Sequence, residues 1–240
     1  DLSSLIRRQP ICALLPEVPP QPVFTEAYIA IGEMAKQLVP GVDLTSDPWL
    51  FQRLVETLDR RLLSALGKSD HTGSISVNLR LATLLSADFL KFDKHFRRQG
   101  KAEMVIELQL VDIFAELGGY MFIRDFLRER GYRICIDGLH HLHLPLISRK
   151  RLGADLMKLV WSPDLLNDTD ERRVVGLKKA IETSGVDRLI LCRCDTADAI
   201  KWGQATGIRL FQGYYLDSRL RAQRSPAVGA ARAALRRRVG

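Results

Sequence analysis

The segment YRICIDGLHHLHLPLISRKRLGADLMKL (residues 132–159) holds two short apolar runs of strand character that carry a charged residue near their ends. The first run ends on Asp137, and the second reaches Lys158. Successive side chains of a strand point to opposite faces, so Asp137 shares a face with Cys135. Residues 138–146, between the runs, have the composition of a loop where a barrel helix would be expected to begin.

Four further strands carry a polar residue at or near their end. These residues are Glu26 in VFTEA, Asn78 in ISVN, Glu107 in VIEL and Gln212 in LFQGY. Stretches of helical periodicity separate the strands. This alternation predicts an α/β barrel with a site at the C-terminal rim of its strands.

Local signals give the bounds of several elements. A helix is expected from Pro48 to about Leu66, with Asp47 as its N-cap and Gly67 at its end. Other helices are expected at 120–129, 170–185 and 196–207, a mixture of helix and loop at 84–99, and the last strand at 208–216.

The two ends of the chain have a different composition. The stretch up to Gln21 is expected to be irregular, because four prolines in LPEVPPQP (15–22) exclude a helix and favour a hairpin connection. Pro226 marks the predicted domain end. We therefore expect a barrel domain over residues 1–225 and a basic C-terminal tail or helix over residues 226–240.

Composition and charge limit the class of protein. The 240 residues are 46% hydrophobic and 27% charged, which is ordinary for one globular barrel domain. No apolar run approaches the roughly 20 residues that span a bilayer, and a first residue other than Met suggests a piece of a longer or membrane-anchored chain. The net charge of +8 favours anionic partners, but the arginine-rich end lacks the interleaved aromatics of a nucleic-acid site.

Cysteine and histidine suggest weaker alternatives. Cys192 and Cys194 share a strand face, but a zinc site needs four ligands and a second cysteine pair is missing. The four cysteines fit a reduced, cytoplasmic setting better. His140, His141 and His143 form a loose pattern that is more typical of a polar rim loop than of a metal site.

The strand-end residues favour metal-assisted chemistry. Glu26, Asn78, Glu107 and Asp137 supply oxygen donors of the kind that suits Mg²⁺, Ca²⁺ or Mn²⁺. Lys158 could hold an anionic phosphate or orient a water molecule. This is the pattern of metal-assisted phosphodiester hydrolysis. The alternative is that polar side chains stand at strand ends because the ends meet water.

Several segments resemble the EAL domain, a bacterial family that hydrolyses cyclic di-GMP. The resemblance covers about residues 9–221 and lies in TEAYIAI, SVNLRLATLLSADFL, IELQL, the segment 132–159 and FQGYYLDSRL, in the family's order. It implies a modified TIM-type (β/α)8 barrel with an irregular N-terminal hairpin or strand. It also implies metal-ligand roles for Glu26, Asn78, Glu107 and Asp137, a water-activating role for Lys158, and a place for Gln212 near the ligand.

The departures from the family pattern concern the same site. Gly138 replaces the second aspartate of the Asp-Asp pair, and residues 139–142 replace the loop that shapes the site and the dimer contact. Leu110 and Cys192 stand where the family has glutamates, and Ala30 where many members have a ligand-contacting arginine. The resemblance thus implies a remnant hydrolase centre that keeps ligands for a single Mg²⁺ or Mn²⁺.

The expected function is a degenerate EAL domain that is inactive as an enzyme and serves as a cyclic di-GMP receptor or protein-interaction module. The alternative is a weakly active, metal-dependent cyclic di-GMP phosphodiesterase. Expected partners are cyclic di-GMP and signalling proteins, without nucleic acid, and a homodimer stays open.

Overall fold

Eight strands form the framework of the protein in the computed structural model, which describes residues 5–44, 46–67, 73–99 and 103–224. The strands are β1 Ile6–Ala13, β2 Gln21–Ile29, β3 Ile75–Asn78, β4 Met104–Gln109, β5 Arg133–Leu139, β6 Leu156–Val160, β7 Leu189–Cys192 and β8 Leu210–Phe211.

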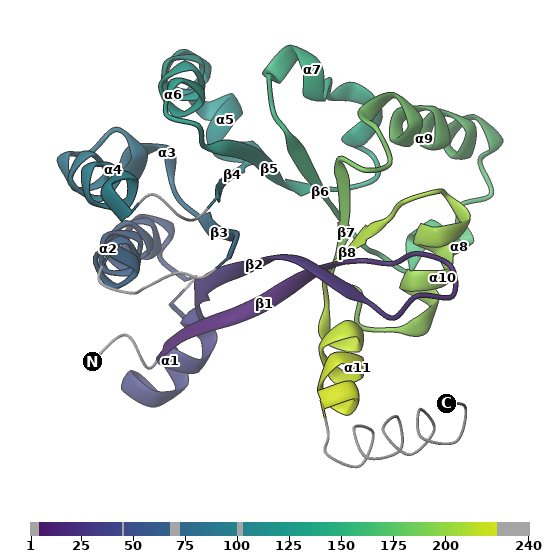
Figure 1. Cartoon of the computed structure of the whole chain (residues 1–240), viewed down its shortest axis with the longest axis horizontal. Helices are drawn as coiled ribbons and strands as arrows, with labels where there is room; N and C mark the ends of the chain where they lie inside the picture. The colour runs from purple at the N-terminus through teal and green to yellow at the C-terminus, as the bar shows by residue number, and fades with distance from the viewer. Residues whose placement is uncertain (1–4, 45, 68–72, 100–102, 225–240) are drawn as a thin grey trace, which may run out of the picture. The chain divides into compact units, whose positions relative to one another are not determined.

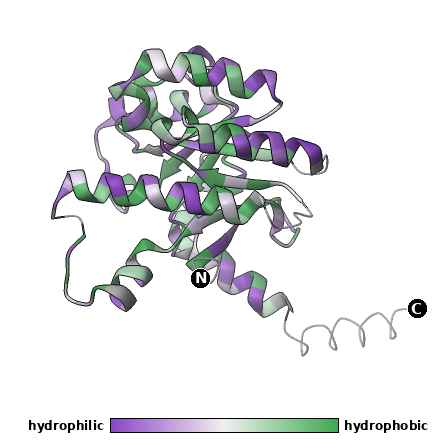
Figure 2. Cartoon of the chain, turned by 90° about the vertical axis from the view of Figure 1, so that its left-hand side faces the viewer, coloured by the Kyte–Doolittle hydropathy of each residue, from purple (hydrophilic) through white to green (hydrophobic). Residues whose placement is uncertain are grey.

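Helices follow most of the strands. They are α1 Ile31–Leu38, α2 Pro48–Gly67, α3 Leu81–Leu84, α4 Ala87–Gln99, α5 Leu110–Ala115, α6 Leu117–Glu129, α7 Arg149–Leu152, α8 Asp164–Asn167, α9 Glu171–Ser184, α10 Ala197–Ala205 and α11 Tyr214–Arg224, with the 3-10 helix η2 Leu144–Leu146. Figure 2 shows that the helices carry both hydrophilic and hydrophobic residues, as amphipathic helices do.

The strands follow one another in chain order around a closed barrel. The printed pairs from β2 to β5 and from β7 to β8 are parallel, whereas β1 pairs with β8 antiparallel, with Cys12 opposite Phe211. The predicted (β/α)8 barrel is therefore confirmed. Its C-terminal tail, residues 226–240, lies outside the described residues.

The chain divides into two compact units. The first comprises residues 1–9, 24–139 and 147–158, and the second comprises residues 10–23, 140–146 and 159–240. In the first unit, β3, β4 and β5 lie side by side, and their central residues such as Ile106 and Ile134 are fully buried (Figure 1). In the second unit, Leu189, Ile190 and Phe211 form the buried part of β7 and β8.

The predicted cap chemistry is confirmed at the start of α2. Asp47 Oδ1 accepts hydrogen bonds from the backbone N–H groups of Trp49 and Leu50, both at 3.0 Å, so α2 begins at Pro48 as expected. Asp170 caps α9 and Thr196 caps α10 in the same manner. These caps depend on a few adjacent residues and are therefore readable from sequence.

The expectation of an irregular N-terminal stretch up to Gln21 is wrong for residues 6–13, which form β1. The prolines lie in the connection to β2, as predicted, but β1 itself is held by a distant partner. The backbone N–H of Leu14 donates to the carbonyl of Arg209 at 2.9 Å, next to the paired residues of β8. Pairing across about 200 residues of chain leaves no local signal.

Two other bounds differ from the prediction. The expected last strand, 208–216, shortens to β8, because Gly213 lies against the backbone of Cys194 and α11 begins at Tyr214. A Cβ at position 213 would come within 2.4 Å of that backbone, so the chain turns where only glycine fits. Leu110, the last residue of the IELQL segment, opens α5 and does not extend β4.

The helices of the described residues include none that combines the length and apolar composition needed to cross a bilayer.

Candidate functional site

An ion-pair cluster joins residues of three strands in the first unit. The ammonium group of Lys158 (β6) donates to Glu26 Oε2 (β2) at 2.7 Å and to Glu107 Oε2 (β4) at 2.6 Å. The side chains of Lys158 and Glu107 are 3% and 0% exposed, and that of Glu26 is 13% exposed. The structure therefore brings together three residues that the sequence selected from distant segments.

Strand register places the other two predicted residues of this unit beside the cluster. Asn78 lies opposite Glu107 across β3 and β4, and Gln109 lies opposite Asp137 across β4 and β5. Asn78 Nδ2 donates to Asp137 Oδ2 at 3.2 Å. Glu26, Asn78, Glu107, Asp137 and Lys158 thus all belong to this unit, as the predicted rim site requires.

Gln109 is a site residue that the sequence analysis missed. Its Nε2 donates to Asp137 Oδ2 at 2.7 Å, and the backbone N–H of Gly138 donates to Asp137 Oδ1 at 2.7 Å. The available signal was the period of two along β4, which places Gln109 on the same face as Glu107. Asp137 therefore has hydrogen bonds on both carboxylate oxygens.

Burial and the neighbouring charges shift the pKa values of both members of the central pair. Burial, followed by the charge of Glu26, raises the pKa of Glu107 to about 8. Burial alone would lower the pKa of Lys158, but the carboxylates of Glu107 and Glu26 raise it well above its ordinary value. Lys158 therefore stays a cation and is held between two acidic groups.

One carboxylate oxygen of the cluster differs from the others in its contacts. Glu107 Oε1 is buried and has no hydrogen-bond partner among the described residues. An ionised oxygen in that position would be costly, and the raised pKa of Glu107 fits a proton there instead.

The family resemblance implies a divalent metal at these residues, and the present arrangement does not fit one. The Lys158 ammonium lies where a cation would meet Glu26 and Glu107. Asp137 receives three N–H groups, which repel a metal ion. Within the described ranges, no group of three or more His, Cys, Asp or Glu side chains has the geometry to hold a metal.

The structure shows the surroundings of two residues that depart from the family pattern, Gly138 and Ala30. Gly138 has φ +79°, and a Cβ on it would lie 2.7 Å from Gln109 Oε1. The space of the absent aspartate is thus partly taken by Gln109. Ala30 is the residue before α1, where it provides no side-chain cap.

The remaining candidates belong to the second unit, which we describe by itself. Gln212 is buried, and its backbone bonds to Leu191 and Cys194. The thiols of Cys192 and Cys194 lie 3.4 Å and 3.2 Å from the carbonyls of Leu159 and Leu191, respectively. Burial is the main cause of a raised pKa at Cys194, so this pair has the character of buried structural thiols.

Several aromatic and histidine side chains of the second unit make ring contacts. The rings of Trp161 and Trp202 lie 5.7 Å apart, and those of His140 and His143 lie 5.7 Å apart at 84°. Tyr215 lies under the guanidinium of Arg219 at 5.0 Å. These contacts fit packing roles for the tryptophans.

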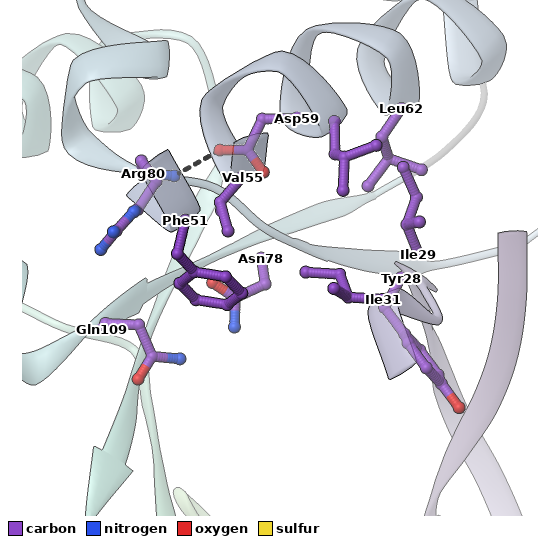
Figure 3. A pocket seen from close by; sticks show the side chains of 11 residues that line it. Tyr28, Ile29, Ile31, Phe51, Val55, Asp59, Leu62, Asn78, Arg80 and Gln109 are labelled. Carbon is purple, nitrogen blue, oxygen red and sulfur yellow. Dashed lines mark hydrogen bonds between the residues drawn. The ribbon is translucent and has the colours of Figure 1, made fainter. Parts of the chain in front are cut away.

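A pocket of about 270 Å³ lies in the first unit next to Asn78 and Gln109. Figure 3 shows the Phe51 ring, both amides and the Arg80 guanidinium around one part of it, with Ile29 and Leu62 at another part. Arg80 donates to Asp112 Oδ1 at 2.8 Å. The pocket thus combines an aromatic face with amide and guanidinium donors.

Comparison with solved structures finds the fold of EAL domains. Vibrio cholerae LapD, solved as S helix-GGDEF-EAL bound to cyclic di-GMP, matches with a TM-score of 0.63 and 16% identity over 88% of this chain and 53% of that chain. Bacillus subtilis YkuI, with an EAL domain in complex with substrate cyclic di-GMP and calcium, matches with a TM-score of 0.59 and 18% identity. The match covers 88% of this chain and 53% of that chain.

The PaMucR phosphodiesterase in complex with cyclic di-GMP also matches, with a TM-score of 0.57 and 18% identity. The match covers 88% of this chain and 94% of that chain. This chain therefore spans about half of the LapD and YkuI chains and nearly all of the MucR chain. No protein-family model and no curated protein matches the sequence. The expected EAL-type barrel is confirmed as a fold.

Proposed function

We propose that this chain is a degenerate EAL domain of bacterial cyclic di-GMP signalling that acts in the cytoplasm as a receptor or protein-interaction module and does not hydrolyse the dinucleotide. One observation carries the proposal, namely the Lys158 ammonium between Glu26 and Glu107. The ammonium places a positive charge between these two carboxylates, as a metal ion would, so a metal is not required there.

Hydrolysis is lost in this proposal because a metal ion would have to displace Lys158 from its two carboxylates. Metal-assisted phosphodiester hydrolysis needs a polarised phosphoryl oxygen and an activated water. Here Lys158 is engaged by two carboxylates, and Gly138 supplies no second aspartate. Cys192, at the position of a family glutamate, is a poor ligand for Mg²⁺.

Support for a receptor comes from the pocket beside the cluster. Phe51 offers a ring face, and Asn78, Gln109 and Arg80 offer hydrogen-bond groups. A guanine base has a π-face and both donors and acceptors on its edges, so these groups suit it. The LapD, YkuI and MucR structures of the same fold contain cyclic di-GMP, and Gln212 stays a proposed ligand contact.

Ala30 supports the version without nucleotide. It stands where the family resemblance implies a ligand-contacting arginine, so one charge contact to a phosphate is missing. The domain would then relay signals through protein contacts alone. A homodimer stays open in this version, because residues 139–142 replace the loop of the family's dimer contact.

The second candidate is a weakly active phosphodiesterase that uses Mg²⁺ or Mn²⁺. It is favoured because Glu26, Asn78, Glu107, Asp137 and Lys158 are gathered in one unit. It requires that Lys158 leave the carboxylates to a metal ion.

Calorimetry tests the receptor role. Cyclic di-GMP is titrated into the full chain in EDTA, so that binding cannot depend on a divalent ion. We expect binding, and a loss of roughly tenfold in affinity for Phe51→Ala, because base stacking on an aromatic ring is worth about 1–3 kcal/mol. Trp49→Ala is the matched control, because Trp49 is 69% exposed on the same helix and does not line the pocket.

Absence of both heat and thermal shift at millimolar ligand would eliminate the receptor and leave the protein-interaction module. Equal effects of Phe51→Ala and Trp49→Ala would exclude the pocket as the base site.

A further inference from the structure

We propose that Gln109 is the positioning residue that closes the carboxylate cluster to divalent metal, and that it does so as a pair with Gly138. The inference rests on the proposed function in one respect, since it takes the cluster as the former metal position. Gln109 is a residue that the family resemblance did not select. In this proposal, metal binding is lost because of two residues on neighbouring strands, Gln109 on β4 and Gly138 on β5.

Both polar atoms of the Gln109 side-chain amide face residues of β5. Its Nε2 donates to Asp137 Oδ2 at 2.7 Å, and its Oε1 lies 2.7 Å from where a Cβ on residue 138 would stand. Cross-strand register fixes this geometry, because Gln109 lies opposite Asp137. The amide therefore fills the place of the absent side chain and holds the aspartate that remains.

The hydrogen bonds of Asp137 explain why a metal is excluded. Gly138 N–H occupies Oδ1, and the amides of Gln109 and Asn78 occupy Oδ2. An incoming cation would have to displace the Gln109 donor from Asp137. Metal ligation needs acceptors, and N–H groups aimed at the carboxylate provide none.

The pairing predicts that restoring the family residue at one position is not enough. In Gly138→Asp, the new Cβ collides with Gln109 Oε1 at less than 3.0 Å. Gln109 Oε1 is the far end of a flexible side chain and can move aside at low cost, but its amide donor stays within reach of Asp137 as long as residue 109 is glutamine. The φ of +79° adds strain, although aspartate tolerates this region better than most residues. Threonine at position 109 is shorter and removes both the collision and the amide donor.

Mn²⁺ binding without nucleotide tests the proposal in the full chain. Calorimetry compares wild type, Gly138→Asp, Gln109→Thr and the double variant, with circular dichroism as a check on folding. We expect no binding by wild type, at most weak binding by either single variant, and at least roughly tenfold tighter Mn²⁺ binding by the double variant, the size of coupling common for side chains in contact.

Gly138→Asn with Gln109→Thr is the control, because it has the same bulk without the charge and should not gain Mn²⁺ affinity. If the aspartate variants do not fold, Gln109→Glu keeps Gly138 and replaces the donor by a carboxylate facing Asp137, and it should also gain Mn²⁺ binding.

Two results would overturn the proposal: Mn²⁺ binding by Gly138→Asp alone that equals the double variant, or no gain in either the double variant or Gln109→Glu. Neither result bears on whether the wild-type chain cleaves cyclic di-GMP, so failure here is distinguishable from failure of the proposed function.

Discussion

At the scale of single residues, the site depends on one buried cation. Lys158 is enclosed and lies within 2.7 Å of an oxygen of both Glu26 and Glu107. Removing one partner of such a cluster leaves acidic groups buried without compensation, which is far more destabilising than losing a surface ion pair.

We therefore expect Lys158→Met, which keeps most of the length of the side chain, to lower the free energy of unfolding by about 3–5 kcal/mol at pH 7. Urea unfolding measures the change. Lys150→Met is the control, since Lys150 is exposed on α7, and it should change the value by less than about 0.5 kcal/mol. A loss below about 1 kcal/mol for Lys158→Met would contradict a buried, charge-compensated cluster.

The residues of this cluster show what the sequence could predict. Glu26, Asn78, Glu107, Asp137 and Lys158 were found because each stands at or near a strand end, a local feature. Gln109 was not found, because its role comes from a neighbour across the sheet. The period of two along β4 places Gln109 on the face of Glu107, but it does not show which side chain of the neighbouring strand Gln109 meets.

At the scale of elements, a buried carboxylate ties α2 to the β3–α3 connection. Asp59 Oδ2 accepts from the Arg80 backbone N–H at 2.9 Å and from the Thr83 hydroxyl at 3.0 Å. Burial raises the pKa of Asp59 to about 6 despite these donors. Between pH 4 and 6 the folded chain therefore binds more protons than the unfolded chain, and this group's contribution to stability falls as the pH rises.

We expect Asp59→Asn to remove this dependence, because one amide oxygen can still accept both hydrogen bonds. The free energy of unfolding of the variant, relative to wild type, should rise by about 2–3 kcal/mol between pH 4 and pH 7. Urea unfolding at several pH values measures it. Asp88→Asn, at a side chain 47% exposed, is the control and should leave the difference nearly constant. A flat difference for Asp59→Asn would refute the raised pKa.

The same contrast between local and distant causes holds for whole elements. Helix α2 was predicted with its cap because Asp47, Pro48 and Gly67 carry the signal themselves. Strand β1 was expected only from the family resemblance, as an N-terminal hairpin or strand, since its pairing with β8 decides it. The early end of β8 likewise depends on how closely Gly213 approaches Cys194.

At the scale of the whole molecule, the barrel is conserved in form while the chemistry at its strand ends differs from a metal site. Likeness to LapD, YkuI and MucR at 14–18% identity establishes the barrel. The internal ion pairs and the Gln109 contact are features of this chain's own residues. Under the proposed function, the scaffold keeps a ligand pocket while the carboxylate cluster serves a structural role.

The central claim is that this barrel does not hydrolyse cyclic di-GMP. The most direct measurement incubates the full chain with an equal concentration of cyclic di-GMP and excess Mn²⁺, and separates cyclic from linear dinucleotide by chromatography. We expect all of the nucleotide to remain cyclic after hours of incubation. Linear product that accumulates with time, and that is lost in Glu107→Gln, would contradict it.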